Sequence, residues 1–287
     1  MIIDTSKVCT SIKLQRTLII LTVSLLLMVS IIWNNIYSKY SVCHLKLRER
    51  PSKWTGASYL SPDYEVEPLK LEYMSATFVV YVYSSFSNVN KRKRLRKIFY
   101  DLFPKGATRL LFVIGTPTKS HSYGDINRVE KELRADGDLL IISVPDRYEN
   151  LSYKGMFALD WILNHCSSLR IAAKIDDDFV DVPKKLYKTM ERLQEKEISN
   201  DILCGKVYHH IPTRGPINTN RLRISRKEYA PRYFPYYCVG NQGTYMTVNV
   251  TKRILDAAKD HDIFAIDDVY VSGLVRLKAG LGLAEVK

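Results

Sequence analysis

The chain has 287 residues, of which 46% are hydrophobic and 25% are charged, and its formal net charge is +13. This length allows one large domain or two small ones, and the composition is that of a globular chain that can bury a core. The sequence contains no internal repeat and no long low-complexity tract, which argues against repeat and disordered architectures.

Much of the positive charge is concentrated in one place. Residues 91–97, Lys-Arg-Lys-Arg-Leu-Arg-Lys, supply six positive charges, and the other basic residues are scattered. A net charge of this size is compatible with a nucleic acid, an anionic membrane surface or an anionic small substrate as partner. Because the excess is local, the total charge alone does not indicate a nucleic-acid surface.

The five cysteines are too sparse for a disulfide scaffold, and none has the paired spacing of a zinc site. They are Cys9, Cys43, Cys166, Cys204 and Cys238. If the chain is secreted, one or two disulfide bonds are possible, and the sequence does not fix their pairing.

An uncharged segment, residues 17–33, follows a short N-terminal stretch that carries three basic residues. It is long for the core of a signal peptide, and no Ala-x-Ala-like cleavage site follows it. At about 1.5 Å per residue, a helix of this length just spans a thin bilayer. The alternative is a buried helix. We expect a cytoplasmic tail at 1–16 and a transmembrane signal-anchor at 17–33.

The orientation of this segment rests on two glycosylation sequons, because lysine and arginine flank it almost equally on both sides. Asn150 and Asn249 each begin an Asn-x-Ser/Thr triplet, which is an acceptor only in a secretory lumen. We therefore expect a single-pass type II protein whose region after the anchor is lumenal, with Asn150 and Asn249 as glycosylation sites.

Residues 34–74 contain three prolines and no hydrophobic period, so we expect a lumenal stem there and a folded domain at 75–287. Apolar and β-branched runs predict strands at 77–83, 110–115, 139–144, 171–175, 202–207 and 244–248. Helices are expected at 91–103, 125–135, 150–166, 182–196 and 252–259 and from residue 267, with Met156 and Trp161 in the core.

Strand and helix alternate almost throughout the folded part, which predicts an α/β fold with a mostly parallel sheet flanked by helices. No Gly-x-Gly-x-x-Gly follows the first strand, and no Gly-Lys-Ser/Thr loop is present. A standard dinucleotide fold and a P-loop enzyme are therefore disfavoured. A nucleotide bound here would have its phosphates held by a metal and basic side chains.

Three carboxylates, Asp176, Asp177 and Asp178, follow the expected strand at 171–175. Ligands of open α/β sheets bind at the carboxyl edge of the strands. Cations such as Mg²⁺ and Mn²⁺ commonly share one or two carboxylates with substrate phosphates. The alternative interpretation of this run is a helix cap or a solvated loop.

Five blocks in order, between about residues 75 and 281, resemble the β1,3-galactosyltransferase family (glycosyltransferase family 31). Residues 92–99 resemble its Arg-x-x-x-Arg-x-Thr-Trp block, with Ile98-Phe99 in place of Thr-Trp. Residues 148–166 resemble Tyr-x-Asn-Leu-Thr-x-Lys…Trp…Cys, and residues 174–180 resemble Lys-x-Asp-Asp-Asp-x-Phe-Val, with one residue fewer before the Phe. Residues 229–243, especially 234–240, resemble Tyr-Pro-x-Tyr-Cys-x-Gly, and residues 266–273 resemble Glu-Asp-Val-Tyr-x-Gly, with Asp267 in place of Glu.

This resemblance implies a GT-A fold and a type II Golgi membrane enzyme. Such an enzyme transfers a hexose from a UDP-sugar to a glycan hydroxyl in β1,3 linkage, with Mn²⁺ and with inversion, and we expect galactose rather than N-acetylglucosamine as the sugar. The expected partners are thus a UDP-sugar, a glycan on a glycoprotein or glycolipid, and a membrane, with no nucleic acid.

The resemblance also implies roles for single residues. Asp176 and Asp178 would hold the metal, and Asp268, with Asp267 beside it, would take the proton from the acceptor hydroxyl. The other implied contacts are to the donor, by Arg92, Arg96, Lys174, Asp176 and Asp177, and to the acceptor, by Tyr236, Tyr237 and Gly240.

Other interpretations stay open at this point. The run at 91–97 could be a solvated helix face or a nuclear-localisation patch, and Asp267 could be a helix N-cap. Histidines 209, 210 and 261 are expected to be solvated or structural, with His210 a minor alternative metal ligand. The chain could also be an inactive family member that binds a glycan or assists a partner enzyme, or a basic nucleic-acid-binding protein.

Overall fold

The computed structural model describes residues 28, 64–66, 68, 73–103, 106–178, 186–190, 193, 200–214 and 222–286. The chain divides into two compact units, Met1–Ser41 and Val42–Lys287, and every described residue except Met28 belongs to the second unit. The expected tail at 1–16 and signal-anchor at 17–33 lie outside the described residues, apart from Met28, which is helical. Among the helices of the described ranges, none has the length and apolar character needed to cross a membrane.

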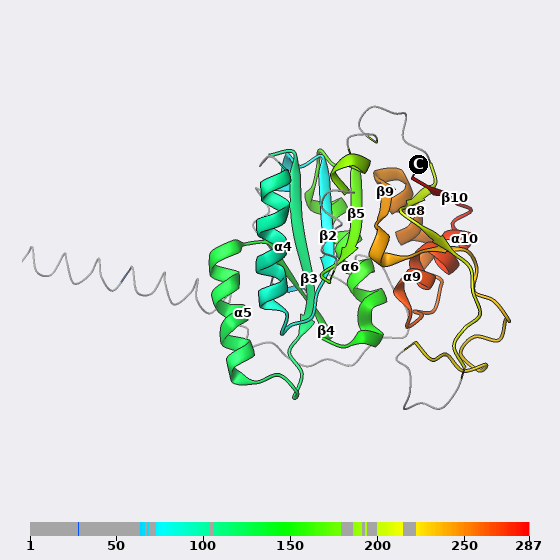
Figure 1. Ribbon diagram of the computed structural model, residues 1–287, viewed down its shortest axis with the longest axis horizontal. Helices are drawn as coiled ribbons and strands as arrows, with labels where there is room; N and C mark the ends of the chain where they lie inside the picture. Colours follow the sequence, from blue (N-terminus) through cyan, green and yellow to red (C-terminus); the bar gives the residue numbers. More distant parts are fainter. Residues whose placement is uncertain are drawn as a thin grey trace, which may run out of the picture. The chain divides into compact units, whose positions relative to one another are not determined.

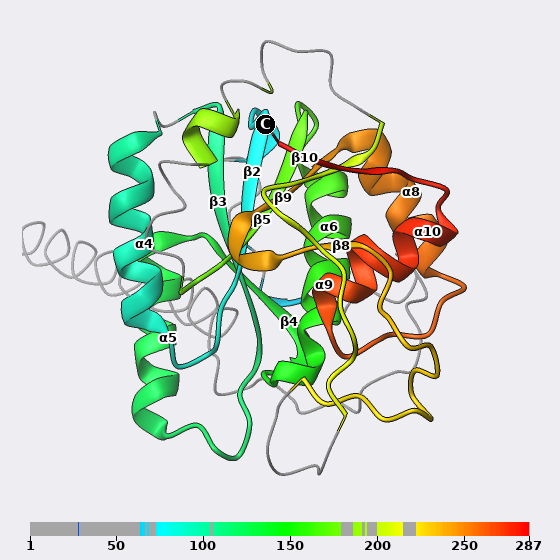
Figure 2. The ribbon, with the colours of Figure 1, turned by 45° about the vertical axis from the view of Figure 1, so that its right-hand side comes forward.

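A sheet of eight strands, in the order β1-β4-β3-β2-β5-β9-β6-β10, forms the centre of the second unit (Figures 1 and 2). Strands β2, β3, β4 and β5 are parallel to one another, β1 and β9 run antiparallel to their neighbours, and β10 is parallel to β6. The strands span Tyr64–Val66 (β1), Phe78–Tyr83 (β2), Thr108–Thr116 (β3), Leu139–Pro145 (β4), Ile171–Asp176 (β5), Ile202–Cys204 (β6), Thr244–Thr247 (β9) and Leu283–Glu285 (β10). The prediction of an α/β fold with a mostly parallel sheet is confirmed.

Helices cover both faces of the parallel strands. Helices α4 (Val89–Leu102) and α5 (Tyr123–Asp136) follow β2 and β3 and lie together on one face, and α6 (Leu151–His165) lies on the other (Figures 1 and 2). This placement follows from right-handed crossovers, because the chain moves outward from β2 to β4 and then returns past β2 to β5. The strand order therefore reverses between β2 and β5.

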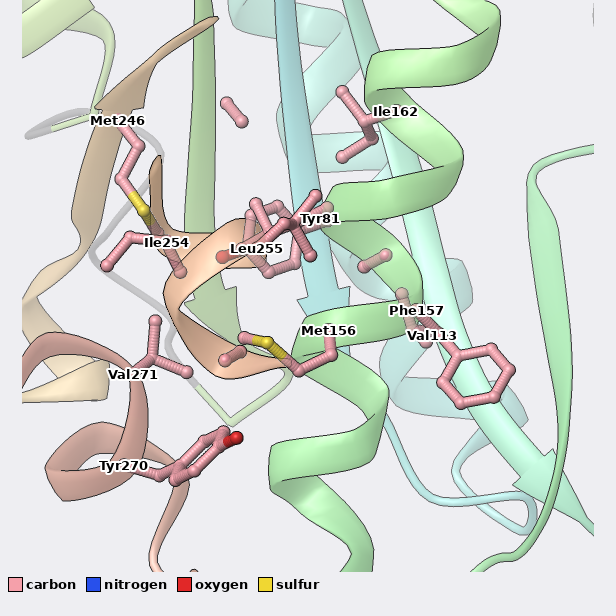
Figure 3. Close-up of a cluster of buried hydrophobic side chains, with 14 of the residues drawn as sticks. Tyr81, Val113, Met156, Phe157, Ile162, Met246, Ile254, Leu255, Tyr270 and Val271 are labelled. Atoms are coloured by element: carbon pink, nitrogen blue, oxygen red, sulfur yellow. The ribbon is translucent and has the colours of Figure 1, made fainter. Parts of the chain in front are cut away.

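The larger core lies between the sheet and α6, with α8 (Val248–Ala258) closing it (Figure 3). Tyr81 and Val113 of the sheet meet Met156 of α6 in this cluster, and all three side chains are buried. Trp161 is fully buried as well and packs edge-on against Tyr73, with 5.1 Å between ring centroids. The prediction that Met156 and Trp161 belong to the core is confirmed.

The last helical segment begins at residue 267, as predicted, but is not a regular α-helix. It consists of α9 (Asp267–Val269), the π-helical η4 (Tyr270–Val275) and α10 (Arg276–Lys278). A π-helical stretch widens the helix locally, and such stretches occur frequently at functional sites. The helix expected at 182–196 is helical at 186–190 and 193, and its other residues lie outside the described ranges.

Two features of the fold differ from the sequence-based expectation. The folded unit begins before residue 75, because β1 pairs with β4 and the buried Tyr73 donates a hydrogen bond of 2.5 Å to the carbonyl of Leu110. The expected strand at 202–207 is divided into β6 and the short β7 (Val207–Tyr208), which pairs with β8 (Tyr237–Cys238) in a separate two-stranded sheet.

A disulfide bond joins Cys204 at the end of β6 to Cys238 in β8. It ties the two-stranded sheet to β6, which lies next to the edge strand β10 of the large sheet. Cys166 is a free, buried thiol, whereas Cys9 and Cys43 lie outside the described residues.

Candidate functional site

A cleft of about 430 Å³ opens at the carboxyl edge of the parallel strands, where the strand order reverses. This is the edge at which open α/β sheets bind ligands. The residues that line the cleft end or follow β2, β4 and β5 or lie at the start of α6 and α9. Six of them are aspartates: Asp146, Asp176, Asp177, Asp178, Asp267 and Asp268. The two acidic runs of the sequence are thus brought together from positions about ninety residues apart.

The ammonium group of Lys174 lies among three of these carboxylates. Its Nζ is 3.0 Å from Oδ1 of Asp176, 3.2 Å from Oδ2 of Asp267 and 3.0 Å from Oδ1 of Asp268. The side chain is buried and lies over the ring of Tyr83, 4.7 Å from its centroid. Burial favours the neutral amine, but the three carboxylates outweigh it and hold the pKa of Lys174 well above its usual value. The residue expected to contact a donor therefore binds the carboxylates of β5 and α9 instead.

Asp267 is not the cap of its helix. Ile266 is the N-cap residue, and Asp267 is the first residue of α9. Burial raises the pKa of Asp267 to about 7, with Lys174 opposing this rise and Asp268 adding to it. Burial likewise raises the pKa of Asp176, against the charge of Lys174. Burial thus favours the protonated form of these two carboxyl groups, and the charge of Lys174 favours the ionised form.

Gly240, at the start of the short helix η3 (Gly240–Gln242), packs directly against this cluster. Its amide donates a hydrogen bond of 2.7 Å to Oδ2 of Asp268, whose other oxygen accepts from Lys174. A Cβ atom at position 240 would lie 2.1 Å from Nζ of Lys174 and 2.8 Å from Oδ2 of Asp176. Glycine is needed here because any side chain would displace the charged groups.

Asp177 and Asp178 play different parts in the cleft. Oδ2 of Asp177 accepts hydrogen bonds from Ser84 Oγ (2.6 Å) and Asn88 Nδ2 (2.9 Å), and Oδ1 lies 3.4 Å from Nζ of Lys91. Asp177 thus binds the loop between β2 and α4 through one oxygen and the first turn of α4 through the other. Asp178 is exposed at the cleft wall. Its carboxylate can reach a bound ligand.

The carboxylate oxygens of Asp176 and Asp178 suit a hard divalent cation, because such ions prefer oxygen ligands. Within the described ranges, no three His, Cys, Asp or Glu side chains form a metal cluster by themselves. An ion held by these two carboxylates would therefore take its remaining oxygen ligands from water and from a substrate, as Mg²⁺ does when it binds phosphates. The residues fit an ion of that kind.

A second ion pair, which the sequence analysis missed, supports the floor of the cleft. Oδ1 of Asp146 accepts from Lys154 Nζ (2.6 Å) and from the amide of Gly115 (3.2 Å), and Oδ2 accepts from the amide of Phe86 (2.5 Å). Lys154 also donates to the carbonyl of Ser84 at 2.7 Å. Burial alone would raise the pKa of Asp146, but Lys154 and the amide donors bring it below the usual value. This pair fixes the loop after β2.

The position of Asp146 could have been found from the sequence. Asp146 follows the strand at 139–145 in the same way that Asp176 ends the strand at 171–176. The carboxyl ends of parallel strands meet at one edge of the sheet. A single acid after a strand is a weaker signal than three, so the sequence indicates Asp146 less strongly than it indicates the run at 176–178.

The structure corrects the expectation that Arg92 and Arg96 contact the donor. Both are buried and face α5 and the start of β4. Arg92 forms two hydrogen bonds to the carboxylate of Glu132 (2.8 and 2.6 Å), and Arg96 forms two to Asp138 (2.8 and 2.6 Å). Arg92 also donates to the carbonyl of Ser85 at 2.6 Å, so it holds the β2–α4 loop rather than a ligand. The basic run at 91–97 is correspondingly not one continuous exposed patch.

The three residues expected at the acceptor lie in two places. Gly240 touches the carboxylate cluster, as described above, whereas Tyr236 and Tyr237 lie on the strand and loop that precede it. Tyr237 is buried and shares a hydrogen bond of 2.7 Å between its hydroxyl and Nε2 of His210. Burial and the charge of Asp268 raise the pKa of Tyr237 to about 12. Tyr236 is exposed and stacks on His209, with 4.3 Å between ring centroids.

The two sequons differ sharply in exposure. Asn150 ends the short helix η2 (Tyr148–Asn150), is only 2% exposed, and donates from Nδ2 to the carbonyl of Pro145 at 2.7 Å. A folded chain therefore cannot accommodate a glycan on Asn150, and the structure corrects that expectation. Asn249 is exposed in the first turn of α8, with its Nδ2 3.3 Å from Oδ1 of Asn200. Asn249 remains the accessible sequon.

Comparison with known proteins shows which family the chain matches. Residues 90–286 match the sequence model of a family described as galactosyltransferase. A segment that covers 72% of this chain is 23% identical to beta-1,3-galactosyltransferase bre-2 of Caenorhabditis elegans, of which it covers 59%. A segment that covers 71% is 26% identical to beta-1,3-galactosyltransferase 4 of Canis lupus familiaris, of which it covers 61%.

A third relative is named for the transfer of N-acetylglucosamine instead of galactose. A segment that covers 68% of this chain is 28% identical to N-acetyllactosaminide beta-1,3-N-acetylglucosaminyltransferase 3 of Homo sapiens, of which it covers 52%. The chain thus spans between half and about three fifths of the length of these curated relatives. Their names share a β1,3 linkage and differ in the transferred sugar.

Proposed function

Because the chain belongs to the galactosyltransferase family, we propose that it is a β1,3-glycosyltransferase that moves a hexose from a UDP-sugar to a glycan hydroxyl with inversion. Galactose is the sugar we propose first, since two of the relatives compared above are named for it. The observation that carries this proposal is the single cleft that both acidic runs, 176–178 and 267–268, line together.

The donor side of the proposed reaction uses the carboxylates that follow β5. Asp176 and Asp178 would hold a Mn²⁺ ion together with the diphosphate of the donor. When bound, such an ion supplies positive charge that stabilises the UDP leaving group. Asp177, fixed by Ser84 and Asn88, would keep this run in its orientation while the donor enters. Lys154 and Asp146 fix the loop on which Ser84 lies.

The acceptor side of the proposed reaction uses Asp268. Inverting transfer needs a base that takes the proton from the attacking hydroxyl, and a carboxylate at the cleft wall can do so. Both oxygens of Asp268 are held, one by Lys174 and one by the amide of Gly240. These two contacts fix the carboxylate in position, and Asp267 shares the charge of Lys174. Gly240 and the tyrosines before it would line the acceptor side.

We also propose that the protein is a single-pass type II Golgi membrane protein with a lumenal catalytic region. The uncharged segment at 17–33 would be the anchor. The exposed sequon at Asn249 and the disulfide between Cys204 and Cys238 support a secretory environment, because disulfides persist in oxidising compartments.

The test is a panel of UDP-sugars incubated with the purified protein and a glycan mixture, with and without Mn²⁺, with release of UDP as the readout. We expect release from one UDP-hexose, accelerated by Mn²⁺ and by glycan. The proposal fails if the wild-type protein releases UDP from none of the donors under any condition.

One observation favours a second candidate, an inactive family member that binds glycans or assists a partner enzyme. Both carboxylate oxygens of Asp268 already accept a hydrogen bond, one from Lys174 at 3.0 Å and one from the amide of Gly240 at 2.7 Å, so an acceptor hydroxyl would have to compete with these donors. Such a protein would bind UDP in an equilibrium measurement and yet release no UDP from any donor in the panel. The same preparation therefore separates the two candidates.

A further inference from the structure

Three aromatic rings form an exposed stack in the segment that leads to the candidate site. The ring of His209 lies between Tyr233 and Tyr236, with centroid distances of 5.2 and 4.3 Å and interplanar angles of 17° and 22°. The guanidinium of Arg232 lies 5.4 Å from the centroid of the Tyr233 ring. Tyr233 is 41% exposed and Tyr236 is 58% exposed, so these rings do not serve a core.

The backbone beneath the stack is firmly held. Phe234, between the two stacked tyrosines, is buried, and its amide donates to the carbonyl of His210 at 3.0 Å. His210 in turn shares a hydrogen bond with the hydroxyl of Tyr237, and Cys238 forms the disulfide with Cys204. The exposed rings are therefore presented on a rigid scaffold, which limits the entropy lost when a ligand binds.

The stack lies close to the carboxylates of the candidate site. Tyr236 is four residues from Gly240, whose amide binds Asp268, so the chain between them spans at most about 14 Å. Strand β8, which follows the stack, lies beside α9, where Asp268 is found (Figure 2). A ligand that extends a short way from Asp268 can reach the rings.

The chemistry of the stack favours a saccharide over a protein. Each aromatic ring buries about 150–250 Å² at most, so the stack offers less than the roughly 800 Å² that each partner contributes to a standard protein interface. A pyranose ring presents C–H bonds on one face and hydroxyl groups at its edge. A flat, rigid tyrosine ring matches the C–H face at low entropic cost, and its hydroxyl can bind the sugar edge.

We propose that His209, Tyr233 and Tyr236 form a saccharide-binding platform that holds a sugar of the acceptor other than the one that receives the hexose. This inference rests on the proposed function, because it takes Asp268 as the place of transfer. It implies that the acceptor is an oligosaccharide rather than a single sugar, and that the platform provides part of its selection.

Glycan binding by the full chain tests the platform. Wild-type protein, Tyr233→Ala, Tyr236→Ala and Tyr236→Phe are applied to an array of hexose-terminated oligosaccharides and their terminal monosaccharides. We expect wild type and Tyr236→Phe to prefer oligosaccharides, and the two alanine variants to bind them about tenfold more weakly, the loss of one stacking contact. Tyr123→Ala, which removes an exposed tyrosine on α5, is the matched control and should bind as wild type does.

The inference is overturned if wild type binds no oligosaccharide more tightly than its terminal monosaccharide, or if the alanine variants bind as wild type does. Release of UDP by wild type, measured on the same preparations, reports separately on the proposed function. Oligosaccharide binding that depends on the stack, without any release of UDP, would keep the platform and reject the enzyme.

Discussion

Replacing Gly240 by alanine should damage the site far more than the fold. The new Cβ would lie 2.1 Å from Nζ of Lys174, whereas non-bonded heavy atoms need about 3.5 Å. The ammonium would have to move by more than about 1 Å, which would lengthen its ion pairs with Asp176 and Asp268, both 3.0 Å long. Misplacement of this size costs about 100-fold in rate, while overpacking costs about 1–3 kcal/mol of stability.

Two assays check this expectation: the rate of UDP release with donor and glycan, and the free energy of unfolding in urea. Gly124→Ala is the matched control, because its Cβ would lie an ordinary 3.6 Å from Oγ of Ser122 on the exposed start of α5. The control should keep the wild-type rate and change stability by less than about 1 kcal/mol. If Gly240→Ala retains the wild-type rate, the position of Lys174 among the carboxylates does not matter for UDP release, which contradicts the expected loss.

Further variants probe the supports of the site and the accessibility of the two sequons. Replacing Cys204 and Cys238 together by serine should lower the free energy of unfolding by about 3–4 kcal/mol, because the disulfide closes a loop whose ends are 34 residues apart. Asp146→Asn should cost about 3–5 kcal/mol at pH 7, because it leaves a buried lysine unpaired. This cost should shrink as the pH falls below 3.8, the usual pKa of the carboxyl group, since the depressed pKa of Asp146 gives stability only while the group is ionised. In a secretory host, Asn249→Gln should remove an N-glycosidase-sensitive mobility shift, and Asn150→Gln should not.

For each of these predictions, one experimental result would contradict it. Unfolding that is unchanged by the cysteine replacements under oxidising conditions would show that the bond adds nothing to stability. A pH dependence of unfolding that is the same for wild type and Asp146→Asn would contradict the depressed pKa. A glycan on Asn150 in the folded protein would contradict its buried position.

The strands of the parallel sheet were predictable because they are long, apolar and buried on both faces. Strand β2, Phe78–Tyr83, is buried at every position, and such a run has few other interpretations. By contrast, β1 and β10 are three residues each at the edges of the sheet, where the pairing partner rather than local sequence decides the structure. Their absence from the prediction therefore has a physical cause.

The burial of two arginines in the basic run, residues 91–97, was not predicted from the sequence. Six positive charges in seven residues suggest an exposed face, yet Arg92 and Arg96 are buried. Their spacing, together with Leu95 and Phe99, places all four side chains on one face of a helix, and that face packs inward. The periodicity was visible, but the acids that neutralise the arginines lie about forty residues away, and only the fold brings them together.

The candidate site was predictable in its parts and not in its contacts. The run at 176–178 follows an expected strand, and the run at 267–268 begins an expected helix. These positions made both runs candidates for the site. The role of Lys174 as their common partner and the close approach of Gly240 depend on side-chain positions from three separate elements. No spacing in the sequence encodes such a contact.

Asp268→Asn tests the central claim most directly, because asparagine keeps the shape of the side chain and cannot accept the proton of the acceptor hydroxyl. The rate of hexose transfer to glycan is measured for wild type and variant, together with the affinity of each for UDP. We expect the variant to lose about 100-fold or more in transfer rate, the range of general-base catalysis, while it binds UDP as wild type does. A variant that transfers hexose at the wild-type rate would contradict the assignment of Asp268 as the base.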